Sequence, residues 1–143
     1  MPTFGQLSTT KLNTCDPRLV QLFLEVIKTY NCVVLAGARS IAEEQANIDK
    51  GTSKLTNPMD SKHVVDPATR PLALAADVAP YTDILTVDWN DKPRFYHFAG
   101  YVKRTAEQLG LIIRWGGAWK GTLNKPGDFN DLDHFELFGG GSV

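Results

Sequence analysis

The sequence predicts an α+β fold: a single domain in which about three helices pack against a small antiparallel sheet. Three observations lead to this fold class. Two segments show helical apolar periodicity and a third carries helix-capping signals, strand-length apolar runs lie between and after them, and 143 residues suffice for one hydrophobic core. No internal repeat, low-complexity segment or linker divides the chain. We therefore expect one domain over residues 1–138 and a flexible tail over residues 139–143.

The first predicted helix lies in CDPRLVQLFLEVIKTY, where Asp16 can cap free backbone N–H groups and Pro17 fits the first helical position. Its apolar side chains recur at steps of three and four residues and form one stripe: Leu19, Leu22, Phe23, Val26, Ile27 and Tyr30. The run CVVLAGA that follows is typical of a buried strand, which Gly37 ends.

The second predicted helix is SIAEEQANIDKG, because Ser40 and Glu43 have the spacing of a capping box and Gly51 suits the C-terminal stop. Residues 52–71 are predicted as a loop. The third predicted helix is KPRFYHFAGYVKRTAEQLG, which Gly110 ends. Five of its residues share the side that faces the core: Phe95, Phe98, Val102, Ala106 and Leu109. After it, the strands LIIRW and LDHFELF flank an irregular loop over residues 116–130.

Composition excludes several classes of function. The net charge of -1 gives no electrostatic reason to expect nucleic acid as a partner. No apolar run approaches the roughly 20 residues of a membrane span, and residues 1–12 lack the basic start and apolar centre of a signal peptide. We expect a monomer made in a cytoplasm, without membrane insertion. Cys15 and Cys32 form no CxxC pattern and are expected as free thiols, Cys15 in a loop and Cys32 in the core.

A strand predicted over residues 73–79 carries one carboxylate in an apolar setting. Period-two alternation places Asp77 on a face of otherwise small side chains: Ala73, Ala75 and Ala79. A buried unpaired charge is expensive, so another group must neutralise Asp77. His63 lies in the preceding loop, and His134 lies on the last predicted strand with Glu136 on the same face.

Two neutral imidazoles and a carboxylate would form a three-ligand zinc site with the fourth position open, if His63, Asp77 and His134 converge. Bound zinc lowers the pKa of water to about 7. Asp131, three residues before His134, is placed to accept that proton and pass it to a leaving amine. These are the parts of a metal-dependent amide hydrolase. Spacing alone leaves an alternative open, in which a lone histidine and a lone aspartate make local hydrogen bonds. His97, in the middle of a helix, is interpreted as structural.

The segments SKH…ALAADVAPY, RWGGAW and DLDHFEL together resemble the zinc peptidases of the D-Ala-D-Ala carboxypeptidase and VanY-like group. Within that group, they resemble most the phage L-alanyl-D-glutamate endopeptidases used as endolysins. The group typically shows Ser-x-His, Ala-x-Asp, Trp-Gly-Gly and Asp-x-x-His-Phe-Glu, and all four occur here in that order. GARSIAEEQ, with Arg39 and Gln45, also resembles an earlier segment of the group. The resemblance covers about residues 15–138.

The resemblance implies a role for several side chains. His63, Asp77 and His134 match the zinc ligands of a single catalytic ion, and Asp131 matches the catalytic base. Arg39 matches an arginine that stabilises the developing oxyanion or holds a substrate carboxylate. The alternative for Arg39 is a structural role, as a helix cap or as the ion-pair partner of Glu43 or Glu44. The pair Glu43 and Glu44 is expected on an exposed helix face. Ser61 matches a residue beside the first ligand that either supports that ligand or binds the substrate.

Other candidates carry two interpretations each. Trp115 and Trp119 are candidates for lining a substrate groove, with a core position as the alternative for Trp115. Glu136 is a candidate for orienting a ligand histidine, with a solvated strand position as the alternative. The stretch between His63 and Asp77 is longer than is usual in the phage enzymes. Asp66, which lies within it, is therefore an alternative ligand to Asp77.

The function that the resemblance implies is hydrolysis of the L-Ala–D-Glu bond in the stem peptide of bacterial peptidoglycan, leading to lysis of a phage host. The protein would wait in the host cytoplasm and reach the cell wall through a separate pore. One alternative is a D-Ala-D-Ala carboxypeptidase or dipeptidase with the same metal chemistry. The other is a non-catalytic wall-binding module of the same fold.

Overall fold

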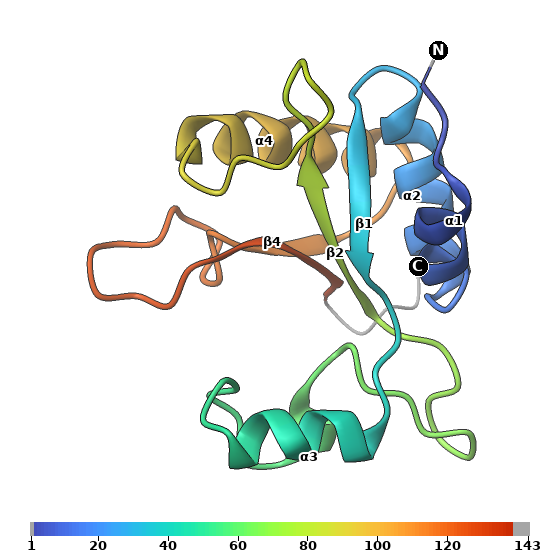
Figure 1. Ribbon diagram of the computed structural model, residues 1–143, viewed down its shortest axis with the longest axis vertical. Helices are drawn as coiled ribbons and strands as arrows, with labels where there is room; N and C mark the ends of the chain where they lie inside the picture. Colours follow the sequence, from blue (N-terminus) through green and yellow to red (C-terminus); the bar gives the residue numbers. More distant parts are fainter. Residues whose placement is uncertain (1, 139–143) are drawn as a thin grey trace.

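Four antiparallel strands form one sheet in the computed structural model, which describes residues 2–138 (Figure 1). The strands lie in the order β1-β2-β4-β3 and span Cys32–Ala36 (β1), Ala75–Pro80 (β2), Ile113–Gly116 (β3) and Asp131–Leu137 (β4). All three strand pairs are antiparallel. The predicted α+β class with a small antiparallel sheet is therefore confirmed. The predicted tail over residues 139–143 lies outside the described residues.

The helices of the described chain are α1 (Gln6–Leu12), α2 (Pro17–Ile27), α3 (Ile41–Asp49) and α4 (Lys92–Gln108), with a short 3-10 helix at Pro58–Asp60. The sequence predicted about three helices, and α1 is the one that it did not predict. Its sequence QLSTTKL is short, and no side chain caps its start at Gly5. Tertiary contact stabilises it, because the buried Ser8 hydroxyl accepts a hydrogen bond from the Val34 N–H at 3.1 Å. No helix among residues 2–138 is long and apolar enough to span a membrane.

The starts of two of the three predicted helices follow the predicted capping residues. The Asp16 side chain accepts from the Arg18 N–H, and Pro17 takes the first helical position of α2. Ser40 and Glu43 form the predicted capping box of α3. These signals act locally, which is why they could be read from the sequence alone.

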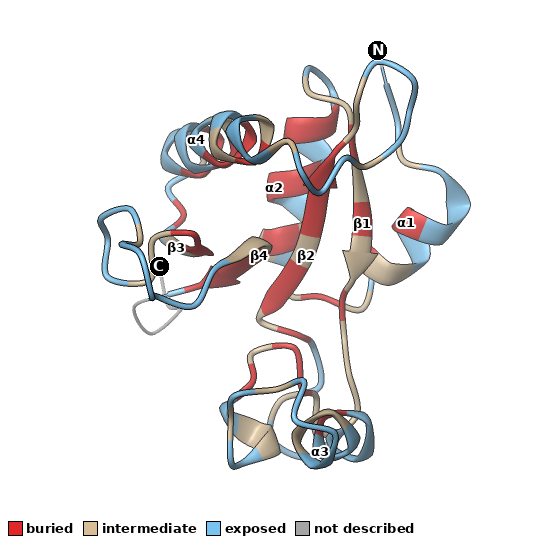
Figure 2. Ribbon diagram, turned by 60° about the vertical axis from the view of Figure 1, so that its left-hand side comes forward, coloured by how far each residue is buried: buried red, intermediate tan, exposed pale blue. Residues whose placement is uncertain are grey.

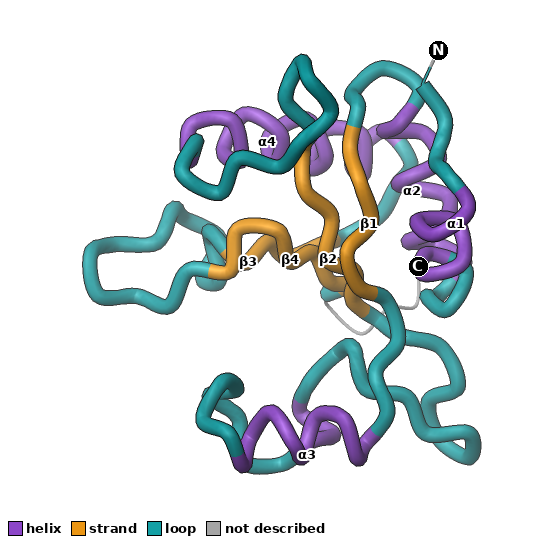
Figure 3. Tube along the Cα trace, in the orientation of Figure 1, coloured by secondary structure: helices purple, strands orange, loops and turns teal. Residues whose placement is uncertain are grey.

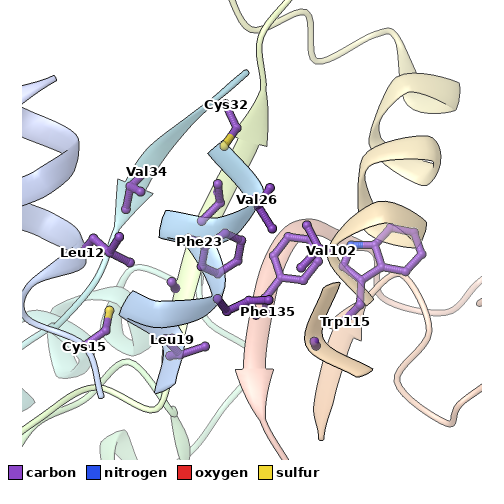
Figure 4. Close-up of a cluster of buried hydrophobic side chains, with 14 of the residues drawn as sticks. Leu12, Cys15, Leu19, Phe23, Val26, Cys32, Val34, Val102, Trp115 and Phe135 are labelled. Atoms are coloured by element: carbon purple, nitrogen blue, oxygen red, sulfur yellow. The ribbon is translucent and has the colours of Figure 1, made fainter. Parts of the chain in front are cut away.

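The hydrophobic core lies where α2 and α4 pack on the sheet (Figure 4). Phe135 of β4 is at its centre, with ring centroids 5.6 Å from Phe23 and 5.9 Å from Phe98. Cys15 and Cys32 are both buried free thiols. Burial raises the pKa of Cys15 to about 11 and that of Cys32 to about 12, so neither is a nucleophile at neutral pH. Cys15, expected in a loop, precedes α2 but points into the core.

The sheet brings together the parts of the chain that matter for chemistry. β2 is a central strand, and its Asp77 pairs with His134 of β4 and with Ala36 of β1. At the end of β3, Gly116 approaches β4 so closely that an added Cβ would collide with the carbonyl oxygen of Asp131. α3 and the loops around it lie apart from the other helices, beyond one end of β1 and β2 (Figures 2 and 3).

Two leucines of α2 test how far the core stabilises this arrangement. Leu22 is 0% exposed and Leu24 is 49% exposed. We expect Leu22→Ala to lower the free energy of unfolding by about 2–5 kcal/mol, because it leaves a cavity in a packed core. Leu24→Ala, the matched control, should change it by no more than about 0.5 kcal/mol. Urea unfolding followed by circular dichroism measures both, and equal losses would contradict the described burial of α2.

Candidate metal centre

Three side chains from distant parts of the chain meet at one point. Asp77 comes from β2, His134 from β4, and His63 from the loop after the 3-10 helix. His63 Nε2 lies 3.0 Å from Asp77 Oδ1, and His134 Nδ1 lies 3.3 Å from the same oxygen. The two ring nitrogens are 3.2 Å apart. Within residues 2–138, this is the one group of three or more potential ligands close enough to share an ion.

The opposite nitrogen of each imidazole is held by its own acceptor. His63 Nδ1 lies 2.8 Å from the carbonyl oxygen of Gly37, and His134 Nε2 lies 2.8 Å from a carboxylate oxygen of Glu136. A carbonyl oxygen and a carboxylate only accept, so each of these nitrogens must be the protonated one. A neutral imidazole then presents a lone pair from its other nitrogen. Two lone pairs and one carboxylate oxygen therefore face each other.

Three facing electron-pair donors repel one another unless a cation lies between them, either protons or a metal ion. Zinc bound at about 2.0–2.1 Å in a tetrahedron holds its ligand atoms about 3.3 Å apart. The observed separations of 3.0, 3.2 and 3.3 Å are close to that value. Two imidazole nitrogens and one carboxylate also suit zinc better than magnesium or calcium, which prefer oxygen ligands. The residues fit a zinc ion with one position left open.

Hydrogen bonds within this cluster determine which of its groups carry a proton when no metal is bound. Burial alone would raise the pKa of Asp77, but hydrogen bonds from His134 and His63 hold it well below its usual value. Burial alone would lower the pKa of His134, yet its hydrogen bonds with Asp77 and Glu136 raise it to about 9. The metal-free site thus holds a proton where the metal would bind. Metal binding must displace that proton.

Asp131 lies beside the cluster. Its carboxylate oxygen Oδ2 is 3.7 Å from His134 Nδ1, and its side chain is about one-third exposed. It is the first residue of β4 rather than part of the preceding turn. A carboxylate in this position can take a proton from a water bound between the three ligands.

Asp133 is a third carboxylate close to Asp77 and Asp131, and it was not among the residues predicted for the site. Burial, together with the charges of Asp77 and Asp131, raises the pKa of Asp133 to about 8. Strict strand alternation would place Asp133 on the face away from His134. The register shifts here, however, since Trp115 pairs with Phe135 whereas the next residue, Gly116, pairs with Asp131. No signal in the sequence marks this bulge.

The cluster forms the floor of a pocket of about 500 Å³. Arg39 lines it, and its guanidinium donates to Glu44 at 3.0 Å. Glu44 is 2% exposed, so the expectation of an exposed glutamate pair on α3 holds for Glu43 and is wrong for Glu44. Ser61 also lines the pocket, and its hydroxyl accepts from the His63 N–H at 3.3 Å.

Glu136 connects the cluster to a second ion pair. It is 3% exposed, which contradicts the alternative of a solvated strand residue. Its second carboxylate oxygen accepts from the Arg114 guanidinium at 2.9 Å. That guanidinium lies over the rings of Trp119 and Phe138, at 5.3 and 4.7 Å from their centroids. Trp119 itself lies beside His134, with ring centroids 5.3 Å apart, and lines the pocket.

Two predicted site residues lie elsewhere. Gln45 donates to Asp49 on the exposed side of α3 and does not line the pocket. Trp115 belongs to the hydrophobic core, as its alternative proposed, and its indole N–H donates to the carbonyl oxygen of Leu132. It also lines a second hollow beside α4. His97 bonds with the Tyr30 hydroxyl, away from the cluster, in keeping with a structural role.

The long stretch between His63 and Asp77 forms an ordered loop. Asp66, the alternative ligand, turns its side chain to the Ala68 N–H at 2.9 Å and is not part of the cluster. Arg70 donates from the same loop to the carbonyl oxygens of Met59, Ser61 and Val64. These three bonds fix the backbone on both sides of His63.

The chain resembles known peptidases over nearly its whole length. Residues 2–139 match the family model described as phage L-alanyl-D-glutamate peptidase. The L-alanyl-D-glutamate peptidase of Escherichia phage T5 is 30% identical over 142 residues, which cover 98% of this chain and 95% of that protein. The crystal structure of the L-Ala D-Glu endopeptidase ChiX of Serratia marcescens superposes with a TM-score of 0.72 and 25% identity, over 94% of this chain and 89% of that one. The predicted resemblance is confirmed: the chain belongs to the phage L-alanyl-D-glutamate peptidase family.

Proposed function

We propose that this protein is a zinc-dependent endopeptidase that hydrolyses the L-Ala–D-Glu bond in the stem peptide of bacterial peptidoglycan. The observation that carries the proposal is the inward orientation of His63 Nε2, His134 Nδ1 and Asp77 Oδ1, with the outer ring nitrogens bonded to acceptors. The bond is inferred from the relatives, which are named as peptidases of L-alanyl-D-glutamate.

His63, Asp77 and His134 would hold the zinc ion. Zinc bound there would supply Lewis acidity and lower the pKa of the attacking water. Glu136 keeps the His134 ring in the required tautomer, because it accepts from Nε2 at 2.8 Å. The carbonyl oxygen of Gly37 does the same for His63.

Asp131 moves the proton in this proposal. Water adds to the carbonyl carbon of L-Ala, and its proton passes to the Asp131 carboxylate. The C–N bond then breaks, and Asp131 returns the proton to the amine of D-Glu, which leaves. Its partial exposure and its position beside His134 suit a group that must reach both the water and the leaving nitrogen.

Arg39 supplies a positive charge on the wall of the same pocket. The ion pair with the buried Glu44 fixes its guanidinium, so that it can stabilise the oxyanion or hold a substrate carboxylate without reorganising. Ser61 acts indirectly, through the backbone of His63.

The biological setting that we propose is lysis of a phage host. Residues 1–138 would act as one peptidase domain and as a monomer, with the cell wall as the substrate. Mass spectrometry of purified muropeptides after digestion tests the bond. We expect fragments with a new amino terminus at D-Glu, whereas release of free D-Ala would favour a carboxypeptidase.

Metal content tests the ligand set directly. Wild-type protein should retain about one zinc ion per chain after dialysis, because three side chains hold it. His63→Ala, Asp77→Ala and His134→Ala should each lose the ion and the activity. Asp66→Ala is the matched control and should keep both. Plasma mass spectrometry gives the zinc content, and a zinc-loaded, active Asp77→Ala variant would refute the assignment.

Asp131→Asn separates proton transfer from metal binding. The variant should keep its zinc while the kcat for muropeptide hydrolysis falls by about 10²–10⁴-fold, the usual contribution of a positioned acid–base group. Asp128→Asn, in the exposed loop before β4, is the control and should be as active as wild type. Equal activity of all three proteins would exclude Asp131 as the base.

The metal-free protein should lose stability as the pH rises from about 6.5 to 9. The pKa of His134 is about 9 when folded, above its ordinary value of about 6.5, so its contribution is present below pH 6.5 and lost as the pH passes 9. Asp133, with its pKa raised to about 8, changes stability in the same direction. Urea unfolding in a chelator at both pH values measures the effect. Loading with zinc should abolish the decline, because the ion replaces the proton. A metal-free protein that is more stable at pH 9 would contradict the coupling.

A further inference from the structure

A second groove, of about 680 Å³, adjoins the metal pocket. It is lined by residues of α4, of β3 and of the segment over residues 118–123. Arg114 and Trp119 line both hollows, so the groove continues from the site where the peptide bond would be cut. Its volume lies within the range that holds a drug-sized ligand, roughly 300–1,000 Å³.

The charged lining of the groove has one sign. Lys103 on α4, Arg114 on β3 and Lys120 in the segment over residues 118–123 all line it, and no aspartate or glutamate does. The metal pocket differs, because carboxylates and cations both line it. Arg114 is paired with Glu136, whereas neither lysine makes an ion pair within residues 2–138. The groove therefore presents two unneutralised positive charges over an apolar and aromatic floor.

Gly100 of α4 also lines the groove. Glycine is unfavourable inside a helix compared with alanine, so its presence there calls for a reason. Close packing does not require a glycine here, because a Cβ added at Gly100 would meet no atom within 4 Å. A side chain at this position would narrow the groove, and glycine keeps it open.

The chemistry of an L-Ala–D-Glu bond is asymmetric. The bond engages the amine of D-Glu, so both carboxyl groups of D-Glu lie on the leaving-group side. One of them continues the chain, which leaves the other as a free carboxylate, and the peptide ends in a further carboxylate. The L-Ala side contributes only a methyl group next to the bond.

We propose that this groove is the binding site for the carboxylate-bearing, leaving-group side of the stem peptide, with Lys103 and Lys120 as its anion-recognising residues. The inference rests on the proposed function and assigns the direction in which the peptide crosses the site. The L-Ala side then lies in the metal pocket itself, away from the groove. Lysines from two separate segments, together with an apolar and aromatic lining, match a peptide with separated carboxylates.

The test compares two synthetic stem peptides that contain L-Ala–D-Glu. One has the D-Glu carboxylate and the terminal carboxylate free, and the other has both as amides. The double variant Lys103→Gln/Lys120→Gln should raise KM for the free-acid peptide by about 3- to 20-fold, the effect of two exposed ion pairs, with kcat unchanged. KM for the amide peptide should not change. Lys50→Gln/Lys92→Gln, which removes two exposed lysines that line neither hollow, is the matched control and should behave as wild type.

Gly100→Leu provides a second, steric test, and it should fold because an added Cβ has free space. It should raise KM for both peptides. Calorimetric titration with the free-acid product peptide, which begins at D-Glu, measures binding without catalysis and should show the same loss for the lysine and glycine variants.

Two results would overturn the inference while hydrolysis by wild type continues. Unchanged KM values in the lysine and glycine variants would exclude the groove as a subsite. An equal rise for the acid and amide peptides in the lysine variant would exclude recognition of the carboxylates. Failure of wild type to cut either peptide would instead count against the proposed function.

Discussion

The mutual repulsion of three electron-pair donors is the constraint on which the site depends. His63 Nε2, His134 Nδ1 and Asp77 Oδ1 lie 3.0–3.3 Å apart. The protein does not relieve this repulsion by rotating the rings, because the other nitrogen of each ring is bonded to an acceptor. A cation is thus part of the folded arrangement. In its absence a proton takes the position, because hydrogen bonds with Asp77 and Glu136 raise the pKa of His134 to about 9.

The surrounding structure keeps these donors in place through several layers of contact. Glu136 holds His134, and Arg114 holds Glu136 through a 2.9 Å bond while its guanidinium lies against two aromatic rings. On the other side, Arg70 fixes the loop that carries His63 through three carbonyl oxygens. Each layer limits the freedom of the next. Preorganisation of this kind lets a site accept a metal ion and a substrate without rearranging.

Arg114 and Trp119 line both the metal pocket and the second groove. They support the metal centre and also separate it from the cationic groove beside α4. A substrate that spans both hollows would therefore contact the residues that orient His134. Binding of the leaving-group side and positioning of the scissile bond are then parts of one surface, which is economical for a domain of this size.

The sequence by itself determined the local features and the order of the motifs. Asp16 and Ser40 marked helix starts, alternation isolated Asp77 on a face of alanines, and Asp131 with His134 formed a compact motif, because each of these signals acts over a few residues. The family resemblance allowed His63, Asp77 and His134 to be grouped before any distance was known.

Only the tertiary structure decided between Asp77 and Asp66, since that choice depends on the register of β2 with β4. The sequence also did not predict α1 or the burial of Glu44, because both depend on long-range packing. It did not predict the environment of Asp133, because a bulge in β4 creates it. Sequence periodicity records which face a residue prefers, whereas the groups that meet it across that face are set by how distant segments fold together.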